Sequence, residues 1–340
     1  MKKIIVAMSG GVDSSVTAAL LKSRGYDVSG VFMKFWSPKS NDDRENKCCS
    51  LDAKLDAKRV AMRLGIPFYV IDAQKEFKKK VVDYFINEYK KGNTPNPCVE
   101  CNKHIKFKIL LNKAMELGAD YIATGHYVKI KSGKLMIAKD KQKDQSYFLW
   151  QLNQKQLSRV LFPLGDYTKD QVRTMAKKFK LPVYKKPDSQ EICFINTKIQ
   201  DFLKRYIKSK PGSIITIDGK KVGEHKGLIF YTIGQRKGIE IGGIGPFYVV
   251  KKDFKKNTLI VSKNERDLLQ KKLIIKNVNW ISSKLYSGEC KVKIRSTAKM
   301  VDATIRGNKI VFAQPQRAIT SGQSAVFYKN NAVLGGGVIE

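Results

Sequence analysis

The sequence predicts an α/β fold in which a doubly wound, mostly parallel sheet is followed by two smaller β-rich regions. Two observations predict it. Apolar strand-like runs alternate with helix-like stretches from residue 4 to about residue 126, which is the pattern of βα units that place helices on both faces of a sheet. From about residue 211, hairpin-like and short β-like runs take over. We therefore expect three domains, over residues 1–197, 198–265 and 266–340.

The sequence of the first region, residues 1–197, predicts strands and helices in alternation. Strands are expected at residues 4–8, 28–34, 67–72 and 121–124, and helices at residues 14–24, 51–64, 77–89 and 105–117. Gly65 and Gly118 close the second and fourth helices. In a parallel sheet the carboxyl ends of neighbouring strands share an edge. We therefore expect the loop after the first strand to lie near Met33 and Gly125, which become candidates for an adenine and ribose pocket. The alternative is that either residue belongs to the core or to a turn.

The second half of the chain predicts β structure. Residues 213–217 alternate in hydrophobicity ahead of a turn at Asp218 and Gly219, and many glycines follow up to residue 245. Short β-like runs then recur at residues 291–295, 310–313, 325–328 and 333–339. Small basic all-β domains are compatible with RNA binding, although they do not by themselves indicate it.

The loop between the first strand and the first helix reads Ser-Gly-Gly-Val-Asp-Ser-Ser, from Ser9 to Ser15. Two glycines before a Ser-capped helix present backbone N–H groups and a helix N-terminus at one point, with no side chain in the way. Such a loop is a phosphate cradle, and the simplest alternative is an ordinary turn. It lacks the Gly-Lys-Ser/Thr of a Walker A motif and the Gly-x-Gly-x-x-Gly of dinucleotide folds.

The charge balance is strongly basic. The chain has 65 Lys and Arg against 30 Asp and Glu, which gives a formal net charge of +35. Because this excess is spread along the whole chain, it favours a polyanionic partner, and nucleic acid is the obvious one. The alternative is a lysine-rich surface that is simply exposed to solvent.

The sequence gives no sign of export or of a membrane partner. The apolar run at residues 4–8 is shorter than the ~7–15 residues of a signal-peptide core. No apolar run approaches the ~18 residues of a membrane span. Six cysteines in 340 residues are too few for a secreted disulfide scaffold. We therefore expect a soluble, cytoplasmic protein whose cysteines are thiols, ligands or catalysts.

A Cys-x-x-Cys motif runs from Cys98 to Cys101, directly after Thr-Pro-Asn-Pro at residues 94–97. The two prolines predict a rigid, non-helical approach that places the cysteines just before a helix. The positive end of a helix lowers the pKa of a nearby thiol and raises its thiolate content. The motif is compatible with a metal half-site or with redox chemistry, and inert buried cysteines are a third interpretation.

Three other cysteines need an interpretation. Cys193 lies in Asp-Ser-Gln-Glu-Ile-Cys-Phe at residues 188–194, where a single cysteine is as compatible with a structural role as with a functional one. Cys48 and Cys49 lie in the polar stretch at residues 36–50, which predicts a loop. For this pair we expect free thiols with no assigned role.

Several motifs together resemble one family. They are SGGVDSS at 9–15, TPNPCVECN at 94–102, KDQSYFL at 143–149, SQEICF at 189–194, YTIGQRKG at 231–238, GQSAVFY at 322–328 and LGGGVIE at 334–340. In this order they resemble the bacterial tRNA-uridine 2-sulfurtransferases, also called tRNA-specific 2-thiouridylases, of the PP-loop ATP pyrophosphatase superfamily. The resemblance covers essentially the whole chain. It implies a PP-loop nucleotide domain, a central tRNA-contacting domain and a C-terminal β-barrel.

The resemblance also implies a reaction. The family adenylates the C2 carbonyl oxygen of the wobble uridine of tRNA with ATP and then transfers sulfur from a cysteine persulfide, giving 2-thiouridine, AMP and pyrophosphate. Cys193 matches the persulfide carrier, and Cys101 matches the second catalytic thiol, which can end in a disulfide with Cys193. The positions that match ATP contacts are Ala7, Met8, Ser9, Gly10, Gly11, Val12, Asp13, Ser14, Met33 and Gly125, and Asp13 is placed to help bind Mg²⁺.

Further positions match tRNA contacts of the family. Those expected at the target base are Asn96, Pro97 and Cys98, those expected elsewhere on the tRNA are Lys143, Asp144 and Gln145, and those expected on the barrel are Arg295 and Ser296. Without the resemblance, residues 143–145 would be interpreted as a solvated loop and Arg295 as a surface charge. The implied partners are tRNA and a cysteine desulfurase or sulfur-relay protein that supplies the sulfur.

One departure from the family leaves an alternative open. Many members have Asp where this chain has Cys98, so three thiols, Cys98, Cys101 and Cys193, could together hold an iron–sulfur cluster that carries the sulfur. The persulfide relay is the preferred hypothesis. Two other classes remain: an ATP pyrophosphatase ligase acting on a small molecule, and a non-catalytic RNA-binding protein that would consume no ATP.

Overall fold

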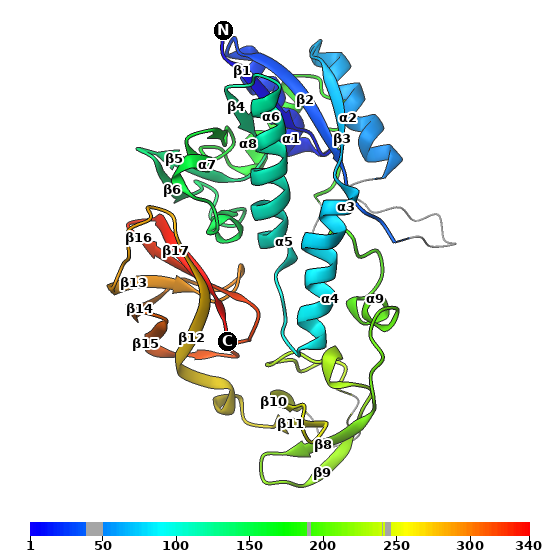
Figure 1. Cartoon of the computed structure of the whole chain (residues 1–340), viewed down its shortest axis with the longest axis vertical. Coiled ribbons are helices and arrows are strands. Elements are labelled where there is room, and N and C mark those ends of the chain that lie inside the picture. The colour runs from blue at the N-terminus through cyan, green and yellow to red at the C-terminus, as the bar shows by residue number, and fades with distance from the viewer. Residues whose placement is uncertain (39–49, 189–191, 240, 242–245) are drawn as a thin grey trace.

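The N-terminal region of the computed structural model is built on a five-stranded parallel sheet (Figure 1). The structure describes residues 1–38, 50–188, 192–239, 241 and 246–340. The strand order is β3-β2-β1-β4-β7, with bounds β1 (Lys3–Ala7), β2 (Asp27–Lys34), β3 (Phe68–Asp72), β4 (Tyr121–Ala123) and β7 (Val160–Leu161). The order reverses between β1 and β4, which is where ligands bind in such sheets.

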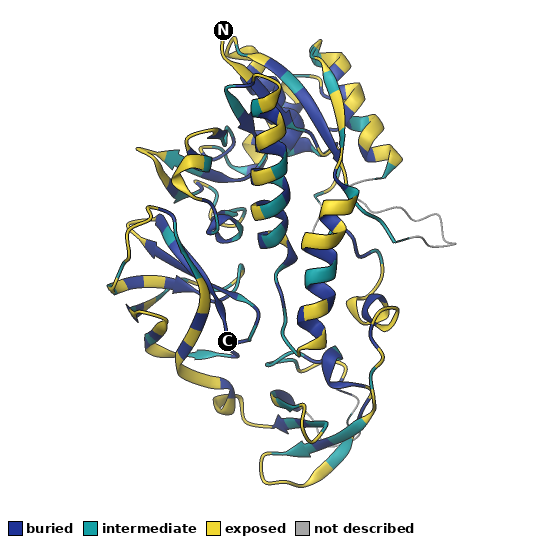
Figure 2. Ribbon diagram, in the orientation of Figure 1, coloured by how far each residue is buried: buried dark blue, intermediate teal, exposed yellow. Residues whose placement is uncertain are grey.

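Both faces of this sheet are covered by helices. One face packs against α1 (Val12–Ser23), α2 (Leu51–Leu64) and α8 (Lys169–Lys178). The other packs against two longer helical stretches, residues 74–90 and residues 97–116. Successive strand residues alternate between the two cores, as Ile4 and Ile5 do. Figure 2 shows β1 and β2 largely buried and the edge strand β3 more exposed. The predicted doubly wound α/β fold is confirmed.

The two long helical stretches each contain a π-helical segment. The first comprises α3 (Gln74–Phe77), η1 (Lys78–Val82) and α4 (Asp83–Lys90), and the second comprises α5 (Pro97–Glu100), η2 (Cys101–Ile109) and α6 (Leu110–Glu116). The prediction that Cys98 and Cys101 lie just before a helix at residues 105–117 is wrong, because this helical stretch already begins at Pro97. Proline fits the first helical position, where its missing N–H is not needed. Elsewhere the helix predicted at 51–64 ends as expected at Gly65, with φ +58°.

The central region forms a small sheet of its own. Its order is β10-β11-β8-β9, with bounds β8 (Gly212–Thr216), β9 (Lys221–His225), β10 (Tyr248–Asp253) and β11 (Thr258–Ser262). The predicted hairpin with its turn at Asp218 and Gly219 is the antiparallel β8–β9 pair.

The C-terminal region closes into a barrel. Its strands are β12 (Leu269–Trp280), β13 (Gly288–Lys293), β14 (Val301–Arg306), β15 (Lys309–Arg317), β16 (Ser324–Lys329) and β17 (Ala332–Ile339). They pair in the order β12-β15-β14-β13-β16-β17, and β12 pairs again with β17. This second pairing closes six strands around an apolar core and confirms the predicted barrel.

A hairpin from the N-terminal region extends the barrel sheet. β5 (Val128–Lys131) and β6 (Lys134–Ile137) follow β4, and β6 pairs with β17 at Met136 and Ala332. Figure 1 shows this hairpin beside β16 and β17. The β5–β6 hairpin was not predicted from the sequence. The shorter helical elements are η3 (Ser146–Leu149), α7 (Gln154–Leu157), α9 (Ile199–Lys204), η4 (Leu228–Phe230) and η5 (Glu265–Leu268).

The barrel also holds the segment that leads to the Cys-x-x-Cys motif. The backbone N–H of Thr94 donates to the carbonyl of Ser321 at 2.8 Å, and Gln323 Nε2 donates to the carbonyl of Thr94 at 2.8 Å. The barrel thereby positions the chain just before Pro97. Among the described residues, no helix is long and apolar enough to cross a bilayer.

Candidate active site

The loop after β1 is closely packed against α2. Gly10 has φ +72°, and a Cβ at this position would lie 2.2 Å from the carbonyl oxygen of Ala53. Only glycine fits this position without a shift of the backbone. Gly11 is the N-cap of α1, and the hydroxyl of Ser15 donates to its carbonyl at 2.7 Å. The loop thus presents the N-terminus of a twelve-residue helix at the sheet edge.

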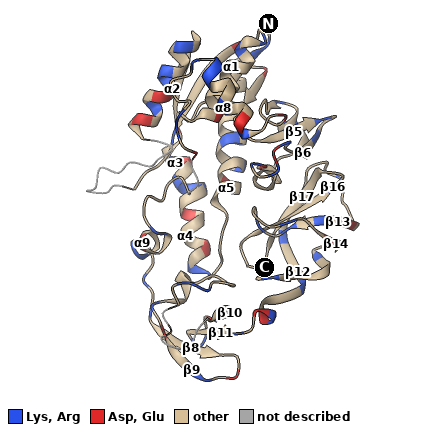
Figure 3. Cartoon of the chain, turned by 180° about the vertical axis from the view of Figure 1, so that it is seen from behind, with Lys and Arg blue, Asp and Glu red and all other residues tan. Residues whose placement is uncertain are grey.

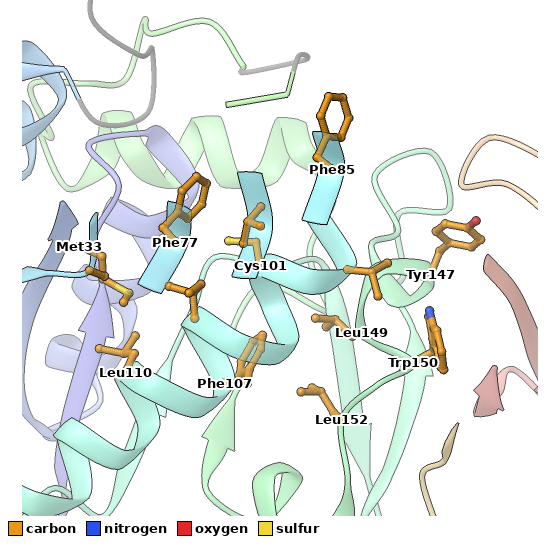
Figure 4. Close-up of a cluster of buried hydrophobic side chains, with 14 of the residues drawn as sticks. Met33, Phe77, Phe85, Cys101, Phe107, Leu110, Tyr147, Leu149, Trp150 and Leu152 are labelled. Atoms are coloured by element: carbon orange, nitrogen blue, oxygen red, sulfur yellow. The ribbon is translucent and has the colours of Figure 1, made fainter. Parts of the chain in front are cut away.

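The two other strand ends predicted for the nucleotide pocket flank this loop. β2 and β4 are the two neighbours of β1. A Cβ on Gly125, just after β4, would lie 2.8 Å from the backbone nitrogen of Ser14, so the end of β4 packs directly against the start of α1. Met33, near the end of β2, is buried, and Figure 4 shows it in the same cluster as Phe77 and Leu110.

The carboxylate of Asp13 lies in a network of charged side chains. Tyr127 donates its hydroxyl proton to Asp13 Oδ1 at 2.8 Å, and Lys169 Nζ lies 2.7 and 2.9 Å from the two carboxylate oxygens. Burial and the neighbouring Asp13 raise the pKa of Tyr127, so its hydroxyl remains a proton donor. Sequence reasoning missed both partners.

Lys169 continues this network to the segment before Cys193. Its Nζ also lies 2.7 Å from Asp188 Oδ1, and Asp188 accepts further contacts from Lys143 at 2.7 Å and Arg173 at 3.0 Å. Burial raises the pKa of Asp188, but the hydrogen bonds from Lys143 and Lys169 outweigh it and hold the pKa at about 2. A chain of ion pairs therefore joins the loop after β1 to residue 188.

A second contact joins the same two segments. Lys186 Nζ donates to the carbonyl oxygen of Gly10 at 3.0 Å and lies 2.7 Å from the carboxylate of Asp56 on α2. The loop is thus held from the side of α8 by Lys169 and from the segment before Cys193 by Lys186.

The two predicted catalytic thiols belong to one part of the core. Cys101 is 7% exposed and lies in the buried cluster drawn in Figure 4, near Phe77 and Phe85. Cys193 is half-buried and packs against the same cluster. The ring of Phe194 lies 5.9 Å from that of Phe77 and 5.4 Å from that of Phe85. The structure therefore brings the two cysteine-bearing segments to one group of aromatic side chains.

The arrangement does not fit a three-thiolate cluster. Cys98 is exposed in the first turn of α5, whereas Cys101 is buried. Within the described ranges, no three His, Cys, Asp or Glu side chains are gathered as a metal ion would require. Cys48 and Cys49, and residues 189–191 before Cys193, lie outside the described residues.

Residues 143–145 form a turn that is held by side-chain hydrogen bonds to neighbouring segments. Asp144 accepts hydrogen bonds from the backbone N–H of Ala138 at 2.9 Å and the hydroxyl of Ser146 at 2.7 Å. Gln145 Oε1 accepts from the backbone N–H of Tyr127 at 2.9 Å. The turn therefore supports Tyr127, while the side chain of Lys143 points to Asp188.

Two of the positions predicted to contact RNA, Asn96 and Arg295, lie near one tyrosine. Tyr147 is fully buried, and the side chain of Asn96, the N-cap of α5, hydrogen-bonds to it. Arg295 contributes a positive charge near this hydroxyl and donates from Nη2 to the carbonyl of Arg317 at 2.7 Å. Ser296 is half-buried beside it, and Pro97 is buried at the helix start.

One sequence pattern could have pointed to Lys169. Thr168 caps α8 in a capping box with Gln171, a pattern that can be read from the sequence. It places Lys169 at the first helical position, where a cation opposes the helix dipole. A lysine in that position indicates an acidic partner but does not say which one.

Comparisons with known proteins agree along the whole chain. Family models match at residues 2–197 (tRNA methyl transferase HUP domain), 200–263 (tRNA methyl transferase PRC-barrel domain) and 270–339 (aminomethyltransferase beta-barrel domain). The tRNA-specific 2-thiouridylase of Clostridioides difficile strain 630 is 48% identical over 100% of this chain and 98% of its own length. The chain belongs to the tRNA-specific 2-thiouridylase family.

Other relatives extend this result. A tRNA-specific 2-thiouridylase of Thermoanaerobacter sp. strain X514 is 50% identical over 99% of this chain and 98% of its own length. Among solved structures, the U34-tRNA thiolase NcsA from Methanococcus maripaludis with its [4Fe-4S] cluster is 19% identical, covers 60% of this chain and 64% of its own, and has a TM-score of 0.37. That similarity is too low to transfer its cluster. Membership in the thiouridylase family confirms the predicted family and class of enzyme.

Proposed function

We propose that this chain catalyses the ATP-dependent 2-thiolation of the wobble uridine of tRNA. The observation that carries the proposal is the ion-pair chain Asp13–Lys169–Asp188, which joins the phosphate-binding loop to the segment before Cys193. Such a link fits a two-step reaction in which the C2 carbonyl oxygen is activated at the loop and sulfur is then delivered from Cys193 to the neighbouring C2 atom. Family membership over the whole chain supports the choice of reaction.

Activation comes first because the C2 carbonyl oxygen of uracil is a poor leaving group. That oxygen attacks the α-phosphorus of ATP and releases pyrophosphate. Backbone N–H groups of residues 7–14, which run from the end of β1 into the first turn of α1, would bind the phosphates, with Met33 and Gly125 beside the nucleoside. Asp13 would hold Mg²⁺ through Oδ2, because Tyr127 and Lys169 both contact Oδ1, whereas Lys169 alone among the described residues contacts Oδ2. Its side chain is 33% exposed, and Mg²⁺ needs only one or two carboxylates beside phosphates. When bound, Mg²⁺ neutralises charge on the pyrophosphate.

Sulfur transfer follows from Cys193. The terminal sulfur of a Cys193 persulfide attacks C2, and AMP leaves with the former carbonyl oxygen. The Cys101 thiolate then attacks the Cys193 sulfur, so that the sulfur–sulfur bond breaks toward the base. The products are 2-thiouridine and a Cys101–Cys193 disulfide, which a thiol reductant must reduce before the next turnover.

The RNA would reach this chemistry by extruding one base from the anticodon loop. We propose that Asn96, Pro97 and Cys98 receive the base and that Lys143, Asp144, Gln145, Arg295 and Ser296 contact the tRNA. The net charge of +35 supports a polyanionic substrate, and Figure 3 shows Lys and Arg on all three parts of the chain. A cysteine desulfurase or a sulfur-relay protein would load Cys193.

The test is thiouridine formation on an unmodified tRNA with a cysteine desulfurase, cysteine and ATP. The variants are Cys98→Ser, Cys101→Ser and Cys193→Ser, with iron counted in each anaerobic preparation. Cys290→Ser is the matched control, because Cys290 is buried in the barrel core and burial raises the pKa of its thiol to about 12. We expect iron-free wild type to be active and only Cys101→Ser and Cys193→Ser to abolish thiolation.

Other outcomes contradict the proposal in distinct ways. Loss of activity in all three variants, together with stoichiometric iron that activity requires, would replace the persulfide relay by a cluster enzyme. AMP release that needs no RNA would indicate a ligase of small molecules. The absence of both thiouridine and AMP would contradict the proposed reaction altogether.

A further inference from the structure

The segment that precedes Cys193 is fastened to α8 by two cations. Lys169 and Arg173 lie one turn apart on α8, and both contact Asp188 Oδ1, at 2.7 and 3.0 Å. Arg173 Nη1 also donates to the carbonyls of Tyr184 at 3.4 Å and Lys186 at 3.3 Å. The backbone of residues 184–188 therefore follows the side of α8.

Lys169 differs from Arg173 and Lys143 because it contacts both Asp13, next to the loop after β1, and Asp188, in the segment before Cys193. Its side chain is only 10% exposed, and its Nζ lies 2.7 Å from Asp13 and 2.7 Å from Asp188. It is the first residue of α8, where a cation is unfavourable for the helix itself. Two carboxylates that share one ammonium group would repel each other if that group were removed. The position of Lys169 is thus explained by what it joins and not by the stability of its own helix.

Lys186 forms a parallel contact. It bridges the carbonyl of Gly10 and the carboxylate of Asp56 on α2. Ala53, also on α2, lies against Gly10. The loop and residues 184–188 are therefore joined at two places, Gly10 and Asp13. Cys193 follows Asp188 by five residues in the chain, so a fixed Asp188 limits how far from α8 Cys193 can lie.

We propose that Lys169 is a positioning residue that keeps the Cys193 segment in register with the phosphate-binding loop. It acts through its ion pairs with Asp13 and Asp188. The inference rests on the proposed role of Cys193 as the sulfur carrier. It predicts that loss of Lys169 separates two events that are normally coupled: AMP is still formed, but sulfur is delivered to fewer of the activated bases.

The experiment compares four variants of the full-length chain. Lys169→Met removes the shared cation, and Lys169→Arg retains a charge that can reach both carboxylates. Asp188→Asn breaks the same link but leaves the Asp13–Lys169 pair in place. Lys177→Met is the matched control, because Lys177 is exposed on the same helix.

Two quantities are measured. The first is the rate of Cys193 alkylation by iodoacetamide without ATP, read from the Cys193 peptide by mass spectrometry. The second is the yield of thiouridine per AMP in a single turnover with persulfide-loaded enzyme. For Lys169→Met and Asp188→Asn we expect alkylation to be about tenfold faster and the yield per AMP to fall about tenfold, a change that corresponds to about 1.4 kcal/mol. Lys169→Arg should restore most of both, and Lys177→Met should match wild type.

The inference is overturned if Lys169→Met and Asp188→Asn both show the alkylation rate and the yield per AMP of wild type. If Lys169→Met does not fold, as shown by its thermal unfolding, Asp188→Asn decides alone. If wild type forms no thiouridine, the proposed function fails, but the alkylation rates still show whether Lys169 holds the Cys193 segment.

Discussion

The hydroxyl of Tyr147 donates a hydrogen bond to the carbonyl oxygen of Ser324, 2.9 Å away, across the boundary between the N-terminal region and the barrel. Trp150 makes a parallel contact, from its indole N–H to the hydroxyl of Ser324 at 3.0 Å. Both aromatic side chains are fully buried. One serine at the start of β16 thus fixes the segment that follows residues 143–145.

Tyr147→Phe should lower the free energy of unfolding. The substitution leaves the buried carbonyl of Ser324 and the side chain of Asn96 without this partner, which costs about 1–3 kcal/mol. Urea unfolding measures the change, and Tyr69→Phe is the control because Tyr69 is 52% exposed. Equal stability of the two variants would show that the contact contributes nothing across the boundary.

Gly10→Ala should abolish ATP binding. The new Cβ would meet the carbonyl oxygen of Ala53 at 2.2 Å, so the loop must move. Gly25→Ala is the matched control: Gly25 has φ +80°, close to the +72° of Gly10, but nothing lies within 4 Å of its Cβ. Both variants carry the left-handed strain of about 1–2 kcal/mol. Calorimetric titration with ATP should therefore separate them, and tight binding by Gly10→Ala would contradict the role given to the loop.

Asp188→Asn should destabilise the protein in a pH-dependent way. Hydrogen bonds to Lys143 and Lys169 hold the pKa of Asp188 at about 2, below its usual 3.8. A lowered pKa means that the stabilisation is complete well above pH 3.8 and disappears as the pH falls toward 2. The difference in unfolding free energy between wild type and variant should thus be constant near neutral pH and shrink below about pH 4. A difference that does not change with pH would rule out the ionised carboxylate as its source.

Lys143→Met tests whether this lysine contacts RNA or only Asp188. If Lys143 neutralises a phosphate, tRNA binding weakens and the slope of log K against log salt concentration falls by about 0.9. We expect that decrease, with Lys177→Met unchanged. An unchanged slope in Lys143→Met would instead assign the side chain to its ion pair with Asp188 at 2.7 Å.

Local signals made much of the fold predictable. The glycine loop after β1 and the helix end at Gly65 depend on a few adjacent residues, and both lie where the sequence predicts them. The start of the helix at Pro97 was predicted too late, because the prolines were interpreted only as helix breakers. The β5–β6 hairpin was missed because its partner, Ala332, is almost 200 residues away in the chain.

The candidate site was predictable only where its residues lie within one short sequence motif. The loop and the cysteines belong to such motifs. Lys169 and Asp13 are 156 residues apart, and Lys186 and Gly10 are 176 residues apart, so tertiary packing alone selects each pair. Single-sequence reasoning can state that a cation at the start of α8 needs a carboxylate. It cannot choose among the 30 Asp and Glu residues of the chain.

The most direct test of the account follows the sulfur itself. The enzyme is loaded with radioactive sulfur from labelled cysteine and a cysteine desulfurase, freed of both, and then given unmodified tRNA and ATP. We predict that the label starts on Cys193 and passes to tRNA as 2-thiouridine, one sulfur for each AMP, leaving a Cys101–Cys193 disulfide. Label that remains on the protein while AMP is formed, or that reaches tRNA from a Cys193→Ser variant, would contradict the central claim.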